Sequence, residues 1–337
     1  MSLFRGNRVL WPLLLGLSLA ACAERELILP GERFDTRAPL VASEPVDGQP
    51  APVDTTATRE NRAAPISLPP ATANADWTHR GGNAGHRPPH GALASAPSLV
   101  WSANIGSGNA RRNRITAAPV VAGGRVYAMD AVARVTAVST AGAVLWSTDL
   151  TPGFDGSALS GGGLALGGGR LFATTGFGEL VALDPAGGGV LWRQRLDSTI
   201  TGAPAVEGNT VYAVGRDGAA WAVQADSGKV LWTLSGTPSV SGVAGSAGPS
   251  VDGNLVLFPF AAGQVIAAEK ATGAGLWAVA VAGERRGRAY ANITDITGEP
   301  VIAGSTAYTA NPTGRTVAVY LQNGQRLWTA REGAVGP

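Results

Sequence analysis

A repeated pattern constrains the fold of this chain more than any other feature. Five copies carry the same residue types at eight positions, and in the third copy, which starts at Pro204, glycine returns after 4, 14 and 24 residues. Each copy closes with a Leu-Trp pair, and the tryptophans are Trp146, Trp192, Trp232, Trp277 and Trp328. Their spacing of 40 to 51 residues matches the length of one β-propeller blade.

Each copy divides into four short segments rich in β-formers, such as Arg125–Ala128 and Glu179–Leu183, which are too brief for helices. Glycines separate these segments where tight hairpins require positive φ. The pattern predicts an all-β propeller of four-stranded antiparallel blades, with the closing tryptophans packed between adjacent sheets. The expected blades lie near residues 119–150, 160–196, 203–236, 248–281 and 299–331.

Other repeat architectures do not fit the pattern. Helical repeats need a 3.6-residue apolar period and few glycines, whereas this chain has 47 glycines. A Trp-Asp repeat places aspartate after tryptophan. The residues that follow the five tryptophans here are Ser147, Arg193, Thr233, Ala278 and Thr329.

The N-terminal part reads as an export signal followed by a tether. Residues 1–21 combine Arg5 and Arg8 with a short apolar run, and Leu19-Ala-Ala-Cys22 is the pattern that precedes an acylated cysteine in bacterial lipoprotein signals. An ordinary signal peptide with a chance cysteine is the alternative. Cys22 is the sole cysteine, so no intrachain disulfide forms. Residues 22–76 are rich in Pro, Ala and Thr and predict a disordered tether before the propeller at 77–337.

The five copies do not predict a closed ring. The segment near 99–104, around Trp101, resembles a lone fourth strand that no group of three strands completes. Closed propellers avoid exposed sheet edges by joining their first and last blades. We therefore expect an open arc, with further residues beyond Pro337 and the Trp101 strand beside the first blade or displaced from it.

Composition and motifs argue against several kinds of site. The net charge of +2 and the lack of a dense basic run exclude non-specific nucleic-acid binding. His79, His86 and His90 crowd a segment that also contains Gly81-Gly82 and Pro88-Pro89, so we expect exposed loop histidines and no metal site. The Gly-Gly-Gly runs are expected to be turns, because strands follow them. No cofactor site is predicted.

The pattern Ala182-Leu-Asp-Pro-Ala-Gly-Gly-Gly-Val-Leu-Trp192 resembles the tryptophan-docking repeat of quinoprotein-type (PQQ-like) propellers. Three further motifs make the whole chain similar to the BamB family, the propeller lipoproteins of the outer-membrane β-barrel assembly (BAM) machinery. They are Leu29-Pro-Gly-Glu-Arg33, Trp101-Ser-Ala-Asn-Ile-Gly-Ser-Gly108 and Tyr290-Ala-Asn-Ile-Thr-Asp-Ile-Thr-Gly-Glu-Pro300. The resemblance implies eight blades, and hence roughly 100 or more residues beyond Pro337.

The resemblance also implies a function. Members are non-enzymatic scaffolds that assist insertion of β-barrel proteins, dock on the barrel subunit of the BAM complex and meet unfolded outer-membrane clients. Ala23 after Cys22 implies anchoring in the outer membrane, on its periplasmic face, through the lipid only. The alternative is a periplasmic quinoprotein-like enzyme or a small-ligand sensor using the propeller channel. The chain lacks the vicinal cysteines and the acidic cluster such enzymes use, so we expect no enzyme.

Candidate partner-binding residues lie in two connectors. The connector between Trp277 and Pro300 is the longest between copies, and long loops on a rigid scaffold commonly bind partners, although a solvated surface loop is the alternative. It contains Arg286, Arg288 and Asp295, of which Asp295 matches an acidic partner-binding position of the family. The family's second acidic position falls on Thr297, and its Leu-Arg pair in the earlier connector falls on Val243 and Ala244.

Overall fold

The computed structural model describes residues 65, 67–153, 161–239, 245–282, 293–330 and 333. Contacts divide the chain into residues 1–67 and residues 68–337, and the second unit contains every described strand. All regular structure in the described residues is β, in five four-stranded sheets. Each sheet is an antiparallel meander made by one sequence repeat, which confirms the predicted all-β blade architecture.

The strands have the following bounds. The first blade holds β1 (Val120–Ala122), β2 (Arg125–Met129), β3 (Arg134–Ser139) and β4 (Val144–Asp149), and the second holds β5 (Gly162–Gly167), β6 (Arg170–Thr175), β7 (Glu179–Leu183) and β8 (Val190–Arg195). The third holds β9 (Ala205–Glu207), β10 (Thr210–Val214), β11 (Ala219–Gln224) and β12 (Val230–Ser235). The fourth holds β13 (Ser250–Asp252), β14 (Leu255–Phe260), β15 (Gln264–Glu269) and β16 (Gly275–Ala280), and the fifth holds β17 (Gly298–Ala303), β18 (Thr306–Asn311), β19 (Arg315–Tyr320) and β20 (Arg326–Ala330).

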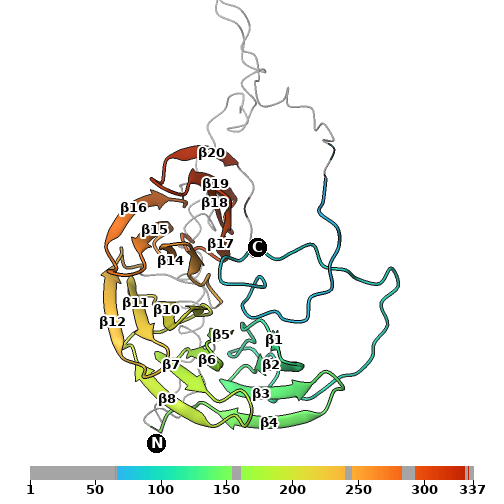
Figure 1. Ribbon diagram of the computed structural model, residues 1–337. Helices are drawn as coiled ribbons and strands as arrows, with labels where there is room; N and C mark the ends of the chain where they lie inside the picture. Colours follow the sequence, from blue (N-terminus) through green and yellow to red (C-terminus); the bar gives the residue numbers. More distant parts are fainter. Residues whose placement is uncertain are drawn as a thin grey trace, which may run out of the picture. The chain divides into compact units, whose positions relative to one another are not determined.

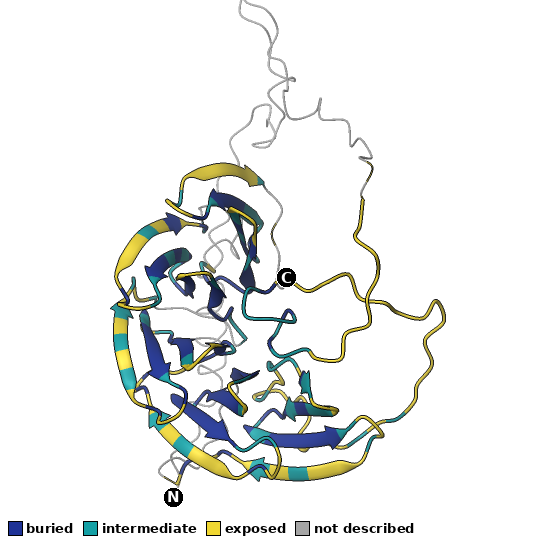
Figure 2. Cartoon of the chain, viewed as in Figure 1, coloured by how far each residue is buried: buried dark blue, intermediate teal, exposed yellow. Residues whose placement is uncertain are grey.

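The blades follow one another around a common centre as an open arc whose ends are the first and fifth blades (Figure 1). The first strands of consecutive blades contact one another in the order β1, β5, β9, β13, β17 and lie innermost, while β4, β8, β12, β16 and β20 form the rim. The middle strands are buried or half-buried, and the rim strands mostly alternate between exposed and half-buried residues (Figure 2). The core therefore consists of the faces that neighbouring blades press together.

A bulge between the third and fourth strands of every blade sets the direction of the closing tryptophan side chain. In the first blade Tyr127, Ala137 and Trp146 lie opposite one another across β2, β3 and β4. The register then shifts, because the next residue of β3 pairs with Val144 and skips Leu145. The same shift follows the equivalent alanine in the other four blades. A bulge re-aims the side chains beside it. The leucine is consequently exposed on the rim, while the tryptophan faces the next blade.

The closing tryptophan of each of the first four blades docks on a glycine turn of the following blade. Gly273 has φ +75°, and a Cβ there would lie 2.6 Å from the ring of Trp232, so only glycine fits. The Trp232 Nε1 donates to the carbonyl of Lys270 at 3.0 Å. The equivalent pairs are Trp101 with Gly142, Trp146 with Gly188, Trp192 with Gly228 and Trp277 with Gly324. Trp328 of the last blade is 47% exposed, and it packs on Tyr308 of its own sheet.

The strand expected near 99–104 is absent: these described residues form no ladder with any sheet. Its tryptophan nevertheless occupies the docking position on the first blade. Trp101 lies against Gly142, and its Nε1 donates to the carbonyl of Thr140 at 2.8 Å. With no three-stranded group to pair with in the described chain, the backbone forms no ladder and only the side chain is anchored.

Candidate functional site

The two predicted connectors lie next to each other. The Ile296 carbonyl accepts a hydrogen bond from the Ala247 amide at 3.0 Å, which joins the connector before the fifth blade to the one before the fourth. Thr294 Oγ1 also donates to the Ala261 carbonyl, at 2.8 Å, in the β14–β15 turn. One region of the molecule therefore combines both connectors.

The structure places Asp295 and Thr297 inside this junction, where they are only 2% and 6% exposed. Ile296 between them belongs to the core shared by the fourth and fifth blades. Arg286, Arg288, Val243, Ala244 and Cys22 lie outside the described residues. Ile296 is the apolar residue of this segment that packs, whereas Ile293 is exposed.

A segment that we call the channel segment, residues 77–87, runs along the inner strands of all five blades. It makes paired backbone hydrogen bonds between Trp77 and Val121 of β1, at 2.7 and 2.8 Å. The other contacts are Leu166 N to the Thr78 carbonyl, Val206 N to His79 Nε2, Val251 N to the Ala84 carbonyl and Ile302 N to the Gly85 carbonyl, at 2.8–3.2 Å. Inner strands present unpaired backbone groups toward the centre, and burying these without partners is costly. The channel segment supplies partners to every blade.

The prediction of exposed histidines is wrong for two of the three: His79 and His86 are each 3% exposed, and only His90 is exposed. Their contacts place a proton on Nδ1 of each ring. His79 Nε2 accepts from the Val206 amide, so its Nδ1 carries the proton that faces Thr78 Oγ1 at 2.9 Å. His86 Nδ1 donates to the Pro300 carbonyl at 3.1 Å. Burial lowers the pKa of His79 to about 4 and that of His86 to about 3.

These histidines predict that the protein loses stability in mild acid. In the unfolded chain both titrate near 6.5, whereas the folded state keeps them neutral until far lower pH. The unfolded state therefore binds more protons in this window, and the unfolding free energy falls as pH drops from about 6.5 toward 4. Urea denaturation at pH 7 and pH 5 measures the slope. The decrease in unfolding free energy from pH 7 to pH 5 should be smaller in the His79→Gln/His86→Asn variant and unchanged in His90→Gln. An unchanged slope in the double variant would contradict this assignment.

A buried ion pair joins the channel segment to the last blade. Arg80 Nη1 lies 2.9 Å from Glu299 Oε1, and the Glu299 side chain is fully buried. Burial raises the pKa of Glu299, while the neighbouring Arg80 charge opposes that rise. Arg80 also approaches the Gly245 carbonyl at 3.5 Å, so the same side chain touches the edge of the two connectors.

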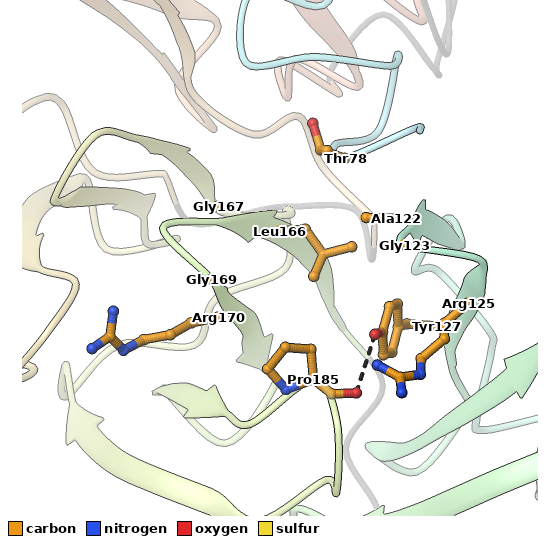
Figure 3. A pocket seen from close by; sticks show the side chains of 10 residues that line it. All are labelled: Thr78, Ala122, Gly123, Arg125, Tyr127, Leu166, Gly167, Gly169, Arg170 and Pro185. Carbon is orange, nitrogen blue, oxygen red and sulfur yellow. Dashed lines mark hydrogen bonds between the residues drawn. The ribbon is translucent and has the colours of Figure 1, made fainter. Parts of the chain in front are cut away.

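A cavity of about 280 Å³ lies between the first and second blades (Figure 3). Leu166, Tyr127 and Pro185 provide its apolar wall, and Arg125 and Arg170 flank it. Elsewhere, the described residues contain no group of three metal-ligating side chains. Within the same residues, no helix has the length and apolarity needed to cross a bilayer.

Comparison with known proteins gives consistent matches. A family model described as outer membrane protein assembly factor BamB matches residues 131–337. The BamB of Shewanella oneidensis is 26% identical over 253 residues, which cover 70% of this chain and 61% of that protein. The chain thus spans about three-fifths of the length of this curated relative.

Two solved structures share the fold. BamB from Moraxella catarrhalis matches with a TM-score of 0.57 at 19% identity, over 69% of each chain. The quinohemoprotein alcohol dehydrogenase of Comamonas testosteroni matches with a TM-score of 0.61 at 20% identity, over 77% of this chain and 50% of that one. At such identities the likeness concerns architecture alone, and an assembly factor and a dehydrogenase share it.

Proposed function

This chain belongs to the family of outer membrane protein assembly factor BamB, and on that basis we propose that it is a non-enzymatic scaffold for assembling β-barrel proteins into the outer membrane. Family membership is the observation that carries the proposal. Its propeller offers a rigid body with long connectors, the arrangement in which binding loops commonly occur. The partners would be the barrel subunit of the BAM complex and unfolded outer-membrane clients.

The docking face in this proposal is the junction of the two connectors. Its support is their hydrogen-bonded contact at Ala247 and Ile296, which makes one surface from two separate loops. We propose Arg286 and Arg288, from the longer connector, as its charged partner contacts. Asp295 and Thr297, being buried, hold the shape of the connector behind it. We propose Val243 and Ala244 as further partner contacts, and Cys22 as the residue whose lipid keeps the protein at the periplasmic side of the outer membrane.

The second candidate is a quinoprotein-like enzyme or a small-ligand sensor, although the likeness to an alcohol dehydrogenase, at 20% identity, concerns the fold alone. The channel segment counts against it, because backbone groups of all five inner strands that would line a central ligand site are already bonded to residues 77–85. Titration of the purified protein with quinone and calcium separates this candidate from the scaffold.

Pulldown from detergent-solubilised envelopes tests the docking face. We expect Arg286→Glu/Arg288→Glu to reduce recovery of the barrel subunit at least tenfold, because reversed charges at a docking face oppose association. Lys229→Glu, on an exposed rim turn of the third blade, is the matched control and should bind normally. Undiminished recovery with the double variant would refute the docking face.

Cys22→Ala should lose fatty-acid labelling and membrane retention while the propeller stays folded.

A further inference from the structure

The cavity between the first and second blades is lined by residues at repeat positions that carry a bridging pair at another interface. At the interface of the third and fourth blades, Glu207 of β9 forms an ion pair with Lys270, which also donates to the Gly253 carbonyl at 2.6 Å. The repeat positions of Glu207 and Lys270 are occupied at the first interface by Ala122 and Pro185. The first interface therefore has short apolar side chains at both positions, and both residues line the cavity.

The wall of this cavity is apolar. Leu166 lies above the neighbouring side chains of Tyr127 and Pro185 in the view, and all three line the cavity (Figure 3). The Tyr127 hydroxyl donates to the Pro185 carbonyl at 3.1 Å, so the tyrosine offers its ring to the cavity. Binding of an apolar ligand group against these side chains is favourable, roughly in proportion to the apolar area of ligand and protein that the contact removes from water.

The mouth of the cavity carries one uncompensated positive charge. Arg125 and Arg170 occupy the same repeat position, where the other three blades have Thr210, Leu255 and Thr306. Arg170 is neutralised by Asp226, 2.9 Å away. Arg125 has no ion-pair partner among the described residues. The nearby Asp76 carboxylate accepts from the Gly123 amide, at 3.2 Å.

We propose that this cavity binds an apolar carboxylate of about the size of one amino-acid residue. The apolar body lies against Leu166 and Tyr127, and the carboxylate pairs with the guanidinium of Arg125. Guanidinium matches a carboxylate with two parallel hydrogen bonds, and these strengthen beside an apolar surface. A volume of about 280 Å³ suits a single side chain or a small acid, at the lower limit of ligand pockets. A free organic acid and the C-terminal residue of a polypeptide both offer this chemistry.

Calorimetric titration of the purified mature chain tests the proposal, independently of BAM-complex docking. The probes are 3-phenylpropionate and its neutral analogue 3-phenylpropanamide. We expect the acid to bind at least tenfold more tightly than the amide, because only the acid pairs with Arg125. Arg125→Gln should lose at least tenfold in affinity for the acid. Arg170→Gln is the matched control, since its charge is already paired, and should change affinity less than threefold.

A second variant tests the cavity itself. Ala122→Leu fills the space, and the fold tolerates longer side chains at this repeat position because Glu207 and Asp252 occupy it in other blades. It should abolish binding and leave the melting temperature close to that of the parent. A peptide ending in phenylalanine, with a free or amidated C-terminus, identifies the source. Tighter binding of the free peptide than of 3-phenylpropionate indicates a polypeptide end, and the reverse indicates a free acid. Equal affinity for acid and amide, no detectable acid binding, or binding that survives both variants overturns the proposal.

Discussion

Replacing Trp232 by alanine is expected to lower the free energy of unfolding by about 3–5 kcal/mol, the usual cost of truncating a large aromatic side chain in a core. Trp232 packs on Gly273 of the next blade and on the rings of Tyr212 and Phe258, at 5.9 and 6.0 Å. Its indole also donates to the Lys270 carbonyl, at 3.0 Å. The variant loses one complete connection between the third and fourth blades. Urea denaturation followed by circular dichroism measures the loss.

Two controls separate docking from general disruption. Trp328→Ala removes the same side chain where it is 47% exposed, and we expect a loss of about 1 kcal/mol or less. Gly273→Ala and Gly304→Ala both place a Cβ at positive φ, but only the first meets a tryptophan, since Gly304 has nothing within 4 Å. Gly304→Ala should cost about 1–2 kcal/mol from backbone strain alone, and Gly273→Ala clearly more. Equal losses within either pair would contradict the docking interpretation.

Replacing Arg80 by methionine is expected to cost about 3 kcal/mol at neutral pH, because it leaves the Glu299 carboxylate buried without its counter-charge. Burial already raises the pKa of Glu299, and loss of Arg80 removes the interaction that opposes this rise. A carboxyl whose folded pKa is raised destabilises the folded state at high pH and is tolerated once it is protonated. The cost of Arg80→Met should therefore shrink as pH falls.

The measurement compares each variant with the parent protein at the same pH, because His79 and His86 change the stability of both. Urea denaturation at pH 8 and pH 5 should give a larger difference between Arg80→Met and parent at pH 8. Adding Glu299→Gln should recover most of the loss, since a neutral amide needs no counter-charge. Arg87→Met should change little, because Arg87 is an exposed neighbour whose guanidinium donates to the Ile302 carbonyl at 3.4 Å and forms no ion pair with a described residue. A pH-independent cost for Arg80→Met would rule out this account.

The blades follow from local sequence rules. Short β-rich segments and glycine turns recur in one register, so each repeat forms its own antiparallel meander from contacts close in the chain. The docking of Trp232 on Gly273 was implicit in the same spacing, because residues that recur at fixed positions meet again at every blade interface. The openness of the arc was also predicted, from the number of complete repeats.

The centre of the molecule was decided only by tertiary structure. The channel segment has no apolar period, and it is held by hydrogen bonds to each of five strands far apart in the sequence. From the sequence alone, His79 and His86 were therefore expected to be exposed loop residues. Asp295 matched a family position, yet its burial comes from the contact of its connector with the fourth blade. The cavity at Leu166 is formed where side chains of two neighbouring blades meet. Sequence periodicity determines contacts that every repeat shares, whereas a contact made once, between distant segments, appears only when the blades are packed.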